Sequence, residues 1–101
     1  MGSSSQNSLQ SFYQNSLEEL KDLFGHVQEM YLIGVTDSRV DWEIIYDRVF
    51  SERCSRRVFT LCNELGSSLD YYDPDTSYEE DVAAFYWALK DKVTQFERLN
   101  I

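Results

Sequence analysis

The sequence predicts an all-α protein that folds as an antiparallel four-helix bundle. Apolar residues recur at steps of three and four over four segments of the 101-residue chain, which is the spacing of one helix face. The connections between these segments are short, so neighbouring helices should run antiparallel. With one proline and four glycines, the chain has little of the turn chemistry that a multi-hairpin β fold needs.

The first helix is expected after a polar N-terminal segment. Residues 1–15 are rich in Ser, Gln and Asn, and we expect them to be either disordered or partly helical, ahead of a single helical domain over residues 16–101. Ser16 to Glu19 form a capping box, in which a hydroxyl and a carboxylate satisfy backbone N–H groups, so the helix should begin there, with Ser8 as the alternative start. Gly34 follows the last periodic apolar residues and is the expected end.

Two helices are predicted in the middle of the chain. One carries the apolar set from Trp42 to Phe50, and the next carries the set from Val58 to Leu69. Gly66 interrupts the second set, so that helix should end or bend there. The helix that carries Trp42 to Phe50 has three candidate N-caps, which are Thr36, Asp37 and Ser38.

The last helix is predicted from Ser77 to the C-terminus. Pro74 breaks any helix in the preceding stretch, and Ser77 to Glu80 form a second capping box. Carboxylates in a first turn are favoured by the helix dipole. Trp87 is out of phase with the apolar stripe of this helix, and we expect it to be partly exposed.

The charge of the chain excludes some classes of partner. The net charge is −9, and both phosphate backbones and anionic membranes require a basic face. No apolar run approaches the roughly 20 residues that span a bilayer. The N-terminus lacks the basic and apolar regions of a secretion signal, and we expect the cytoplasm as the location.

Catalytic and metal chemistry find little support in the sequence. His26 is the only histidine and has no nucleophile motif nearby, so we expect a surface histidine and no enzyme. Cys54 and Cys62 are expected to be free, semi-buried thiols, and with one histidine they do not make a zinc site. The calcium-loop spacing that starts at Asp73 fails where glycine and glutamate are required, so we expect no metal and no cofactor.

Four arginines form the one basic cluster of the chain. They are Arg48, Arg53, Arg56 and Arg57. A phosphate site is one interpretation. The favoured one is a solvated pair of helix ends, with the arginines paired to Asp47, Glu52 and Glu64, because exposed ion pairs are common and weak.

The most informative segment is the acidic stretch of residues 70–81. Six of its twelve residues are carboxylates, three are tyrosines and none is basic. Acidic groups interleaved with rigid aromatic side chains suit the docking of a basic protein. The predicted partner-binding residues are Asp70, Tyr72, Asp73, Asp75, Tyr78, Glu79 and Glu80.

The order of these motifs resembles a known family. An aromatic-Leu-x-Gly turn at residues 31–36 leads into an aromatic helix with Trp42 and with Tyr46 to Phe50. The segment 61–69 then precedes the Tyr-Asp-Pro-Asp loop at residues 72–75, and Tyr78 to Asp81 open the final helix. This layout resembles the colicin-D-like bacterial immunity proteins, which include immunity proteins of contact-dependent growth inhibition systems and are small acidic four-helix bundles.

The resemblance implies that the chain inhibits a cognate toxin inside the producing cell. Family members bind the nuclease domain of the toxin, and the colicin D type cleaves transfer RNA. Because a nuclease site is basic, carboxylates that occupy it block access to the substrate. The alternative is a phage anti-defence protein that mimics nucleic acid, for which carboxylates should be spread along the surface instead of gathered at one loop.

Overall fold

The computed structural model describes the backbone of residues 2–71 and 77–99, and the side chains of residues 11–71 and 77–99. All of the regular structure in these ranges is helical, which confirms the all-α class. The elements are α1 (Gly2–Thr36), α2 (Trp42–Val49), the π-helical turn η1 (Glu52–Arg56), α3 (Arg57–Glu64) and α4 (Tyr78–Leu99).

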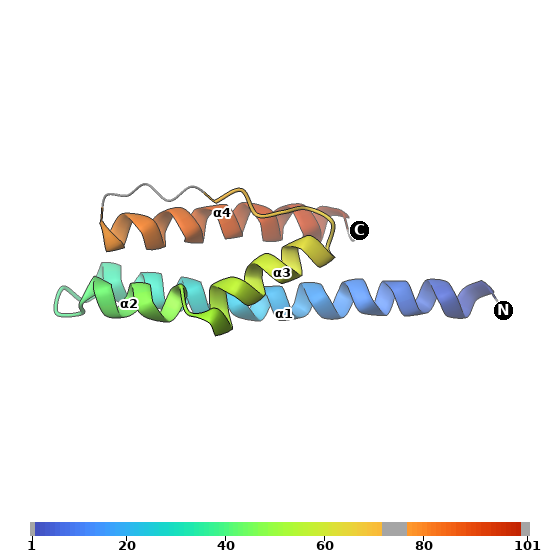
Figure 1. The fold of residues 1–101 in the computed structure, drawn as a ribbon, viewed down its shortest axis with the longest axis horizontal. Coiled ribbons are helices and arrows are strands. Elements are labelled where there is room, and N and C mark those ends of the chain that lie inside the picture. Colours follow the sequence, from blue (N-terminus) through green and yellow to red (C-terminus); the bar gives the residue numbers. More distant parts are fainter. Residues whose placement is uncertain (1, 72–76, 100–101) are drawn as a thin grey trace.

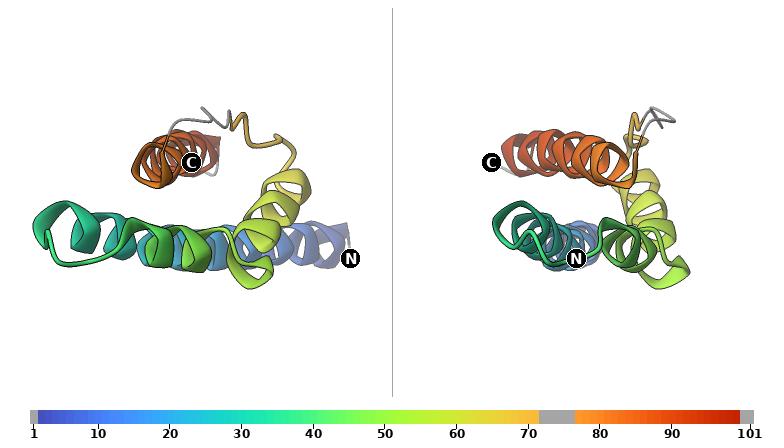
Figure 2. Two further views of the ribbon diagram at one scale, coloured as in Figure 1. Left: turned by 60° about the vertical axis from the view of Figure 1, so that its left-hand side comes forward. Right: turned by 90° about the vertical axis from the view of Figure 1, so that its left-hand side faces the viewer.

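A regular bundle of four comparable helices is not confirmed. The 35 residues of α1 and the 22 residues of α4 flank two helices of eight residues each. In Figure 1, α2 folds back along α1, and α4 runs antiparallel to α1 above both. The views in Figure 2 show α1 and α2 as one layer and α4 as the other, with α3 rising between the layers beside α2. The first turns of α1 extend past the end of α4 (Figure 1), and the molecule measures 58 × 23 × 22 Å.

The prediction that the first helix begins at Ser16 is wrong. The helix passes through this position without interruption from Gly2. Ser16 is buried, and its hydroxyl donates to Glu64 Oε2 at 3.4 Å instead of capping a helix. The hydroxyl of Tyr13, one turn earlier, donates to the carbonyl of Phe96 at 3.3 Å. The polar N-terminal segment is therefore helical, and its last turn contacts the domain.

The junction between α1 and α2 differs from the sequence prediction at both ends. Thr36 ends α1, so Gly34 lies inside the helix and is not the stop. Gly34 is buried, and a Cβ built on it would overlap the Trp42 ring. The N-cap of α2 is Asp41, whose Oδ1 accepts from the Glu43 N–H at 3.0 Å, so the three predicted caps are wrong.

Two predicted helix ends are confirmed. Gly66 has a φ of 96°, and its N–H donates to the Asn63 carbonyl at 3.1 Å while the Ser67 N–H donates to the Cys62 carbonyl at 3.1 Å. This pair of bonds is a Schellman motif, which requires the left-handed residue that glycine supplies. At the start of α4, Ser77 Oγ accepts from the Glu80 N–H at 3.2 Å, as the capping box predicts.

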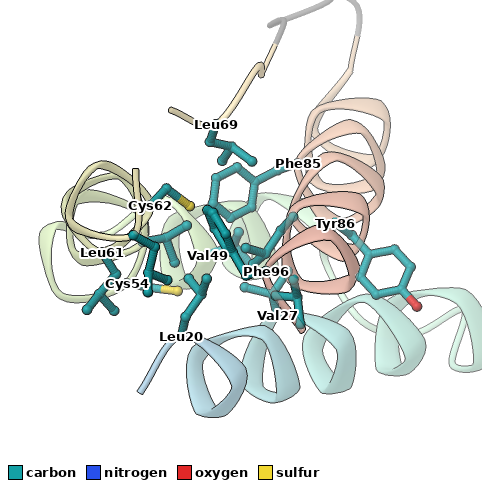
Figure 3. Packing of buried hydrophobic residues seen from close by; sticks show 14 of the residues in the cluster. Leu20, Val27, Val49, Cys54, Leu61, Cys62, Leu69, Phe85, Tyr86 and Phe96 are labelled. Carbon is teal, nitrogen blue, oxygen red and sulfur yellow. The ribbon is translucent and has the colours of Figure 1, made fainter. Parts of the chain in front are cut away.

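The core lies between α1 and α4, closed on one side by η1 and α3 (Figure 3). Phe85 and Phe96 of α4 are fully buried. Cys54 and Cys62 are free, as predicted, and more deeply buried than expected. Burial raises the pKa of the Cys62 thiol to about 11. Over the described residues, none of the helices combines the length and the apolar character that crossing a membrane requires.

Candidate functional site

A chain of aromatic contacts fixes the start of α4 against α2. The ring of Tyr78, the first residue of α4, lies 5.0 Å from that of Tyr46 on α2, centroid to centroid. Tyr46 in turn lies 4.7 Å from Phe50, and Phe50 lies 5.1 Å from the buried ring of Phe85. Aromatic pairs at these separations stabilise the contact beyond the area that they bury. Tyr78 is thus anchored to the core although 45% of it is exposed.

The beginning of the acidic stretch contacts the same series of aromatic rings. Tyr71 packs edge-on against Phe85 at 5.4 Å and lies 5.6 Å from Phe50. Its neighbour Asp70 is exposed. The Phe85 ring that Tyr71 contacts belongs to a residue seven positions after Tyr78, which is about 10 Å along α4 at a rise of 1.5 Å per residue.

Four of the predicted site residues are described, and we refer to Asp70, Tyr78, Glu79 and Glu80 as the acidic edge. All four are exposed. None of the ion pairs found among the described residues involves Asp70 or Glu79. The remaining predicted residues, Tyr72, Asp73 and Asp75, lie outside the described residues.

Two carboxylates of the acidic edge also stabilise the helix that carries them. Glu79 and Glu80 stand in the first turn of α4, where the positive end of the helix dipole favours negative charge by about 0.3–1 kcal/mol each. Asp81 in the same turn differs from them, because it is buried. The hydroxyl of Ser77 caps this turn by accepting from the Glu80 N–H.

The arginine cluster is partly paired, though not with all of the predicted partners. Arg56 pairs with Glu52 at 3.8 Å, as predicted. Arg57 instead binds Glu19 of α1 through two hydrogen bonds of 2.6 and 2.9 Å. This pair lowers the pKa of Glu19 and raises that of Arg57. The predicted partner Glu64 accepts the hydrogen bond from Ser16.

A groove that the sequence did not predict lies where α1 meets the end of α2 and the start of η1. Its volume is about 500 Å³. His26 contributes to it and is exposed, as expected for a surface histidine. The groove is lined by Leu23, His26, Asp47, Arg48, Ser51, Arg53 and Cys54. A step of three or four residues on α1 aligns Leu23 with His26, but only the fold brings them to the arginines.

Two further surface features are visible in the structure. Trp87 is 52% exposed, which confirms the prediction, and the Lys90 ammonium lies 4.9 Å from its ring centroid. Large apolar side chains are also exposed near the α1–α2 connection, namely Leu32, Ile33, Val35 and Ile44. Within the described part of the chain, no three His, Cys, Asp or Glu side chains gather as a metal site would require.

The structure therefore defines a small all-α protein with an exposed acidic edge beside a tyrosine that is anchored in the core. In comparisons with protein-family models, curated proteins and solved structures, nothing matches this chain.

Proposed function

We propose that this protein is an immunity protein that binds and inhibits a basic nuclease toxin, with a tRNA-cleaving ribonuclease as the expected target. The acidic edge would cover the basic active site of the toxin, and the protein would act in the cytoplasm without catalysis of its own. In this proposal α2 and α3 count as the two middle helices of a shortened antiparallel four-helix bundle.

The observation that carries the proposal is the position of Tyr78. Its ring is held by Tyr46, yet 45% of the residue is exposed, and the exposed Glu79 follows it directly. A rigid aromatic side chain loses little conformational entropy on binding, and for that reason tyrosines are enriched among the residues that dominate interfaces. The surrounding carboxylates would attract a cationic partner and orient it.

The alternative is a phage anti-defence protein that mimics nucleic acid. One observation supports it: exposed carboxylates also follow the outer side of α1, at Glu18, Asp22 and Glu29. In that case affinity should depend on charge along the length of the molecule, and the position of Tyr78 would have no special importance.

The two candidate functions can be distinguished by removing two negative charges at two different places on the surface. Asp70→Asn with Glu79→Gln removes two charges from the acidic edge, and Glu29→Gln with Asp91→Asn removes two exposed charges elsewhere. Binding to the product of a neighbouring toxin gene is measured by calorimetry at low and high salt. An immunity protein should lose about tenfold in affinity with the first pair and little with the second, and Tyr78→Ala should also weaken binding.

Several results would contradict the proposal. Equal losses from both charge pairs, with no effect of Tyr78→Ala, would favour the nucleic-acid mimic. A genomic neighbourhood without a toxin gene, or retention of a metabolic enzyme in a pull-down from lysate, would exclude the immunity function. The unfolding midpoint of each variant, measured in parallel, separates loss of binding from loss of fold.

A further inference from the structure

The groove between α1, α2 and η1 combines an apolar floor with cationic side chains. Leu23 of α1 is half-buried and Cys54 of η1 is buried, and the other lining side chains are polar or charged. A volume of about 500 Å³ falls within the range of small-molecule sites, which are mostly apolar with a few polar groups that fix the ligand. Figure 3 shows Cys54 on the side of the core that faces away from α4.

The two arginines of the groove differ from the other two of the cluster. Arg56 and Arg57 are engaged by Glu52 and Glu19. The side chains of Arg48 and Arg53 take part in none of the ion pairs or hydrogen bonds found among the described residues, although both line the groove. The backbone carbonyl of Arg48 accepts from Ser51 Oγ at 3.1 Å. Lys90 and Arg98 of α4 likewise take part in none of these ion pairs among the described residues, so the distinguishing feature of Arg48 and Arg53 is that both line one groove.

The other titratable groups at the groove are His26, Asp47 and the Cys54 thiol, whose pKa is raised by burial. Asp47 is exposed and forms no ion pair with either arginine within the described residues. With His26 neutral, the three charged side chains of the groove therefore sum to one positive charge. The planar guanidinium group matches carboxylate and phosphate geometry through paired hydrogen bonds.

We propose that this groove binds a small organic anion, with Arg48 and Arg53 holding a carboxylate or phosphate head and Leu23 and Cys54 contacting an apolar body. The overall negative charge does not prevent this. Interactions between exposed charges are screened over about 8 Å at physiological ionic strength, so the nearest groups dominate the local field. The site is separate from the acidic edge and does not depend on the proposed toxin partner.

The test uses the full chain in 0.15 M salt and two probes, hexanoate and phenyl phosphate. Hexanol supplies the apolar body without the charge, and inorganic phosphate supplies the head without the body. Amide NMR signals of Leu23, His26 and Cys54 should shift and saturate with both organic anions. Neither control compound should saturate these shifts at the same concentrations. The organic anion with the higher affinity is the better ligand of the two.

Matched variants then test the role of the arginines. Arg48→Gln with Arg53→Gln should weaken binding at least about tenfold, because charge-assisted hydrogen bonds are lost. Arg56→Gln removes an arginine of the same cluster that does not line the groove, and binding should be unchanged. The shift map of the unmodified protein remains decisive even if the double variant does not fold.

Three results would overturn the proposal. The first is the absence of shifts at groove residues with either anion. The second is saturation by hexanol at the same concentration, which would indicate apolar adsorption alone. The third is an equal loss of affinity in Arg56→Gln and in the double variant, which would indicate attraction to the basic cluster as a whole.

Discussion

The close approach of α1 to Trp42 can be tested by one substitution made at two positions of the same helix. Gly34 and Gly25 both lie within α1. A Cβ at Gly34 would lie 2.6 Å from Cζ2 and 2.7 Å from Cζ3 of the Trp42 ring, whereas a Cβ at Gly25 would have nothing within 4 Å. Both alanine variants gain the same helix propensity, so their difference isolates the contact with the ring.

The expected magnitudes follow from these distances. Gly25→Ala should stabilise the protein by about 0.5–1 kcal/mol, the usual gain from removing a mid-helix glycine. Gly34→Ala receives the same gain but forces the ring or the helix to move, and overpacking of this kind costs about 1–3 kcal/mol. The two variants should therefore differ by about 1–3 kcal/mol, with Gly34→Ala no more stable than the unmodified protein.

Urea unfolding followed by circular dichroism measures both free energies, and an unchanged slope shows that the unfolding reaction is the same. A second substitution provides the control for the mechanism. Trp42→Leu removes the ring, so Gly34→Ala made in that background should lose most of its penalty. Equal stabilisation by Gly25→Ala and Gly34→Ala would refute the close packing of α1 against α2.

Three further predictions concern the ion pair, the thiols and the core. Because Arg57 lowers the pKa of Glu19, the pair stabilises the fold above the unfolded pKa of glutamate, and this contribution is lost as pH falls through the lower folded value. Glu19→Gln should thus reduce the unfolding midpoint at pH 7, and its effect should shrink as the pH falls below the unfolded pKa of glutamate. Burial raises the pKa of Cys62 to about 11, so a thiol reagent at about pH 8 should react slowly with the folded protein and quickly in urea, and equal rates would contradict the burial. Phe85→Ala should cost about 3–5 kcal/mol in urea unfolding, since the ring is fully buried and contacts the rings of Phe50, Phe59 and Tyr71, whereas a loss below about 1 kcal/mol would contradict that packing.

Two helix ends that depend on local chemistry were predicted correctly from the sequence, whereas the Gly34 stop and the N-cap of α2 were not. Ser77 caps α4 and Gly66 ends the α3 segment, because each needs only its own hydroxyl or its own backbone freedom. The Ser16 capping box failed for the opposite reason. Its hydroxyl binds Glu64, 48 residues away, so a tertiary contact replaced the local one and the helix continued.

In the candidate site too, features set by neighbouring residues could be predicted from the sequence, and contacts between distant residues could not. The place of Glu79 and Glu80 in the first turn of a capped helix was predicted from the sequence, but that place does not decide exposure, because Asp81 in the same turn is buried. The support that Tyr46 gives to Tyr78 joins residues 32 positions apart, and no spacing within either helix predicts it. The Arg57–Glu19 pair was missed because the sequence offered several carboxylates and only the packing of α1 against α3 selects one.

The short helix α2 links the two proposed sites. Tyr46 turns its ring toward Tyr78 at the acidic edge, and the next residue, Asp47, lines the groove. Consecutive helix residues point about 100° apart, so one eight-residue helix can serve two separate surfaces. Basic side chains line the groove, whereas the acidic edge itself contains none. This separation of charge means that a basic protein and a small anion would be attracted to different sides of the same helix, and neither would need to displace the other.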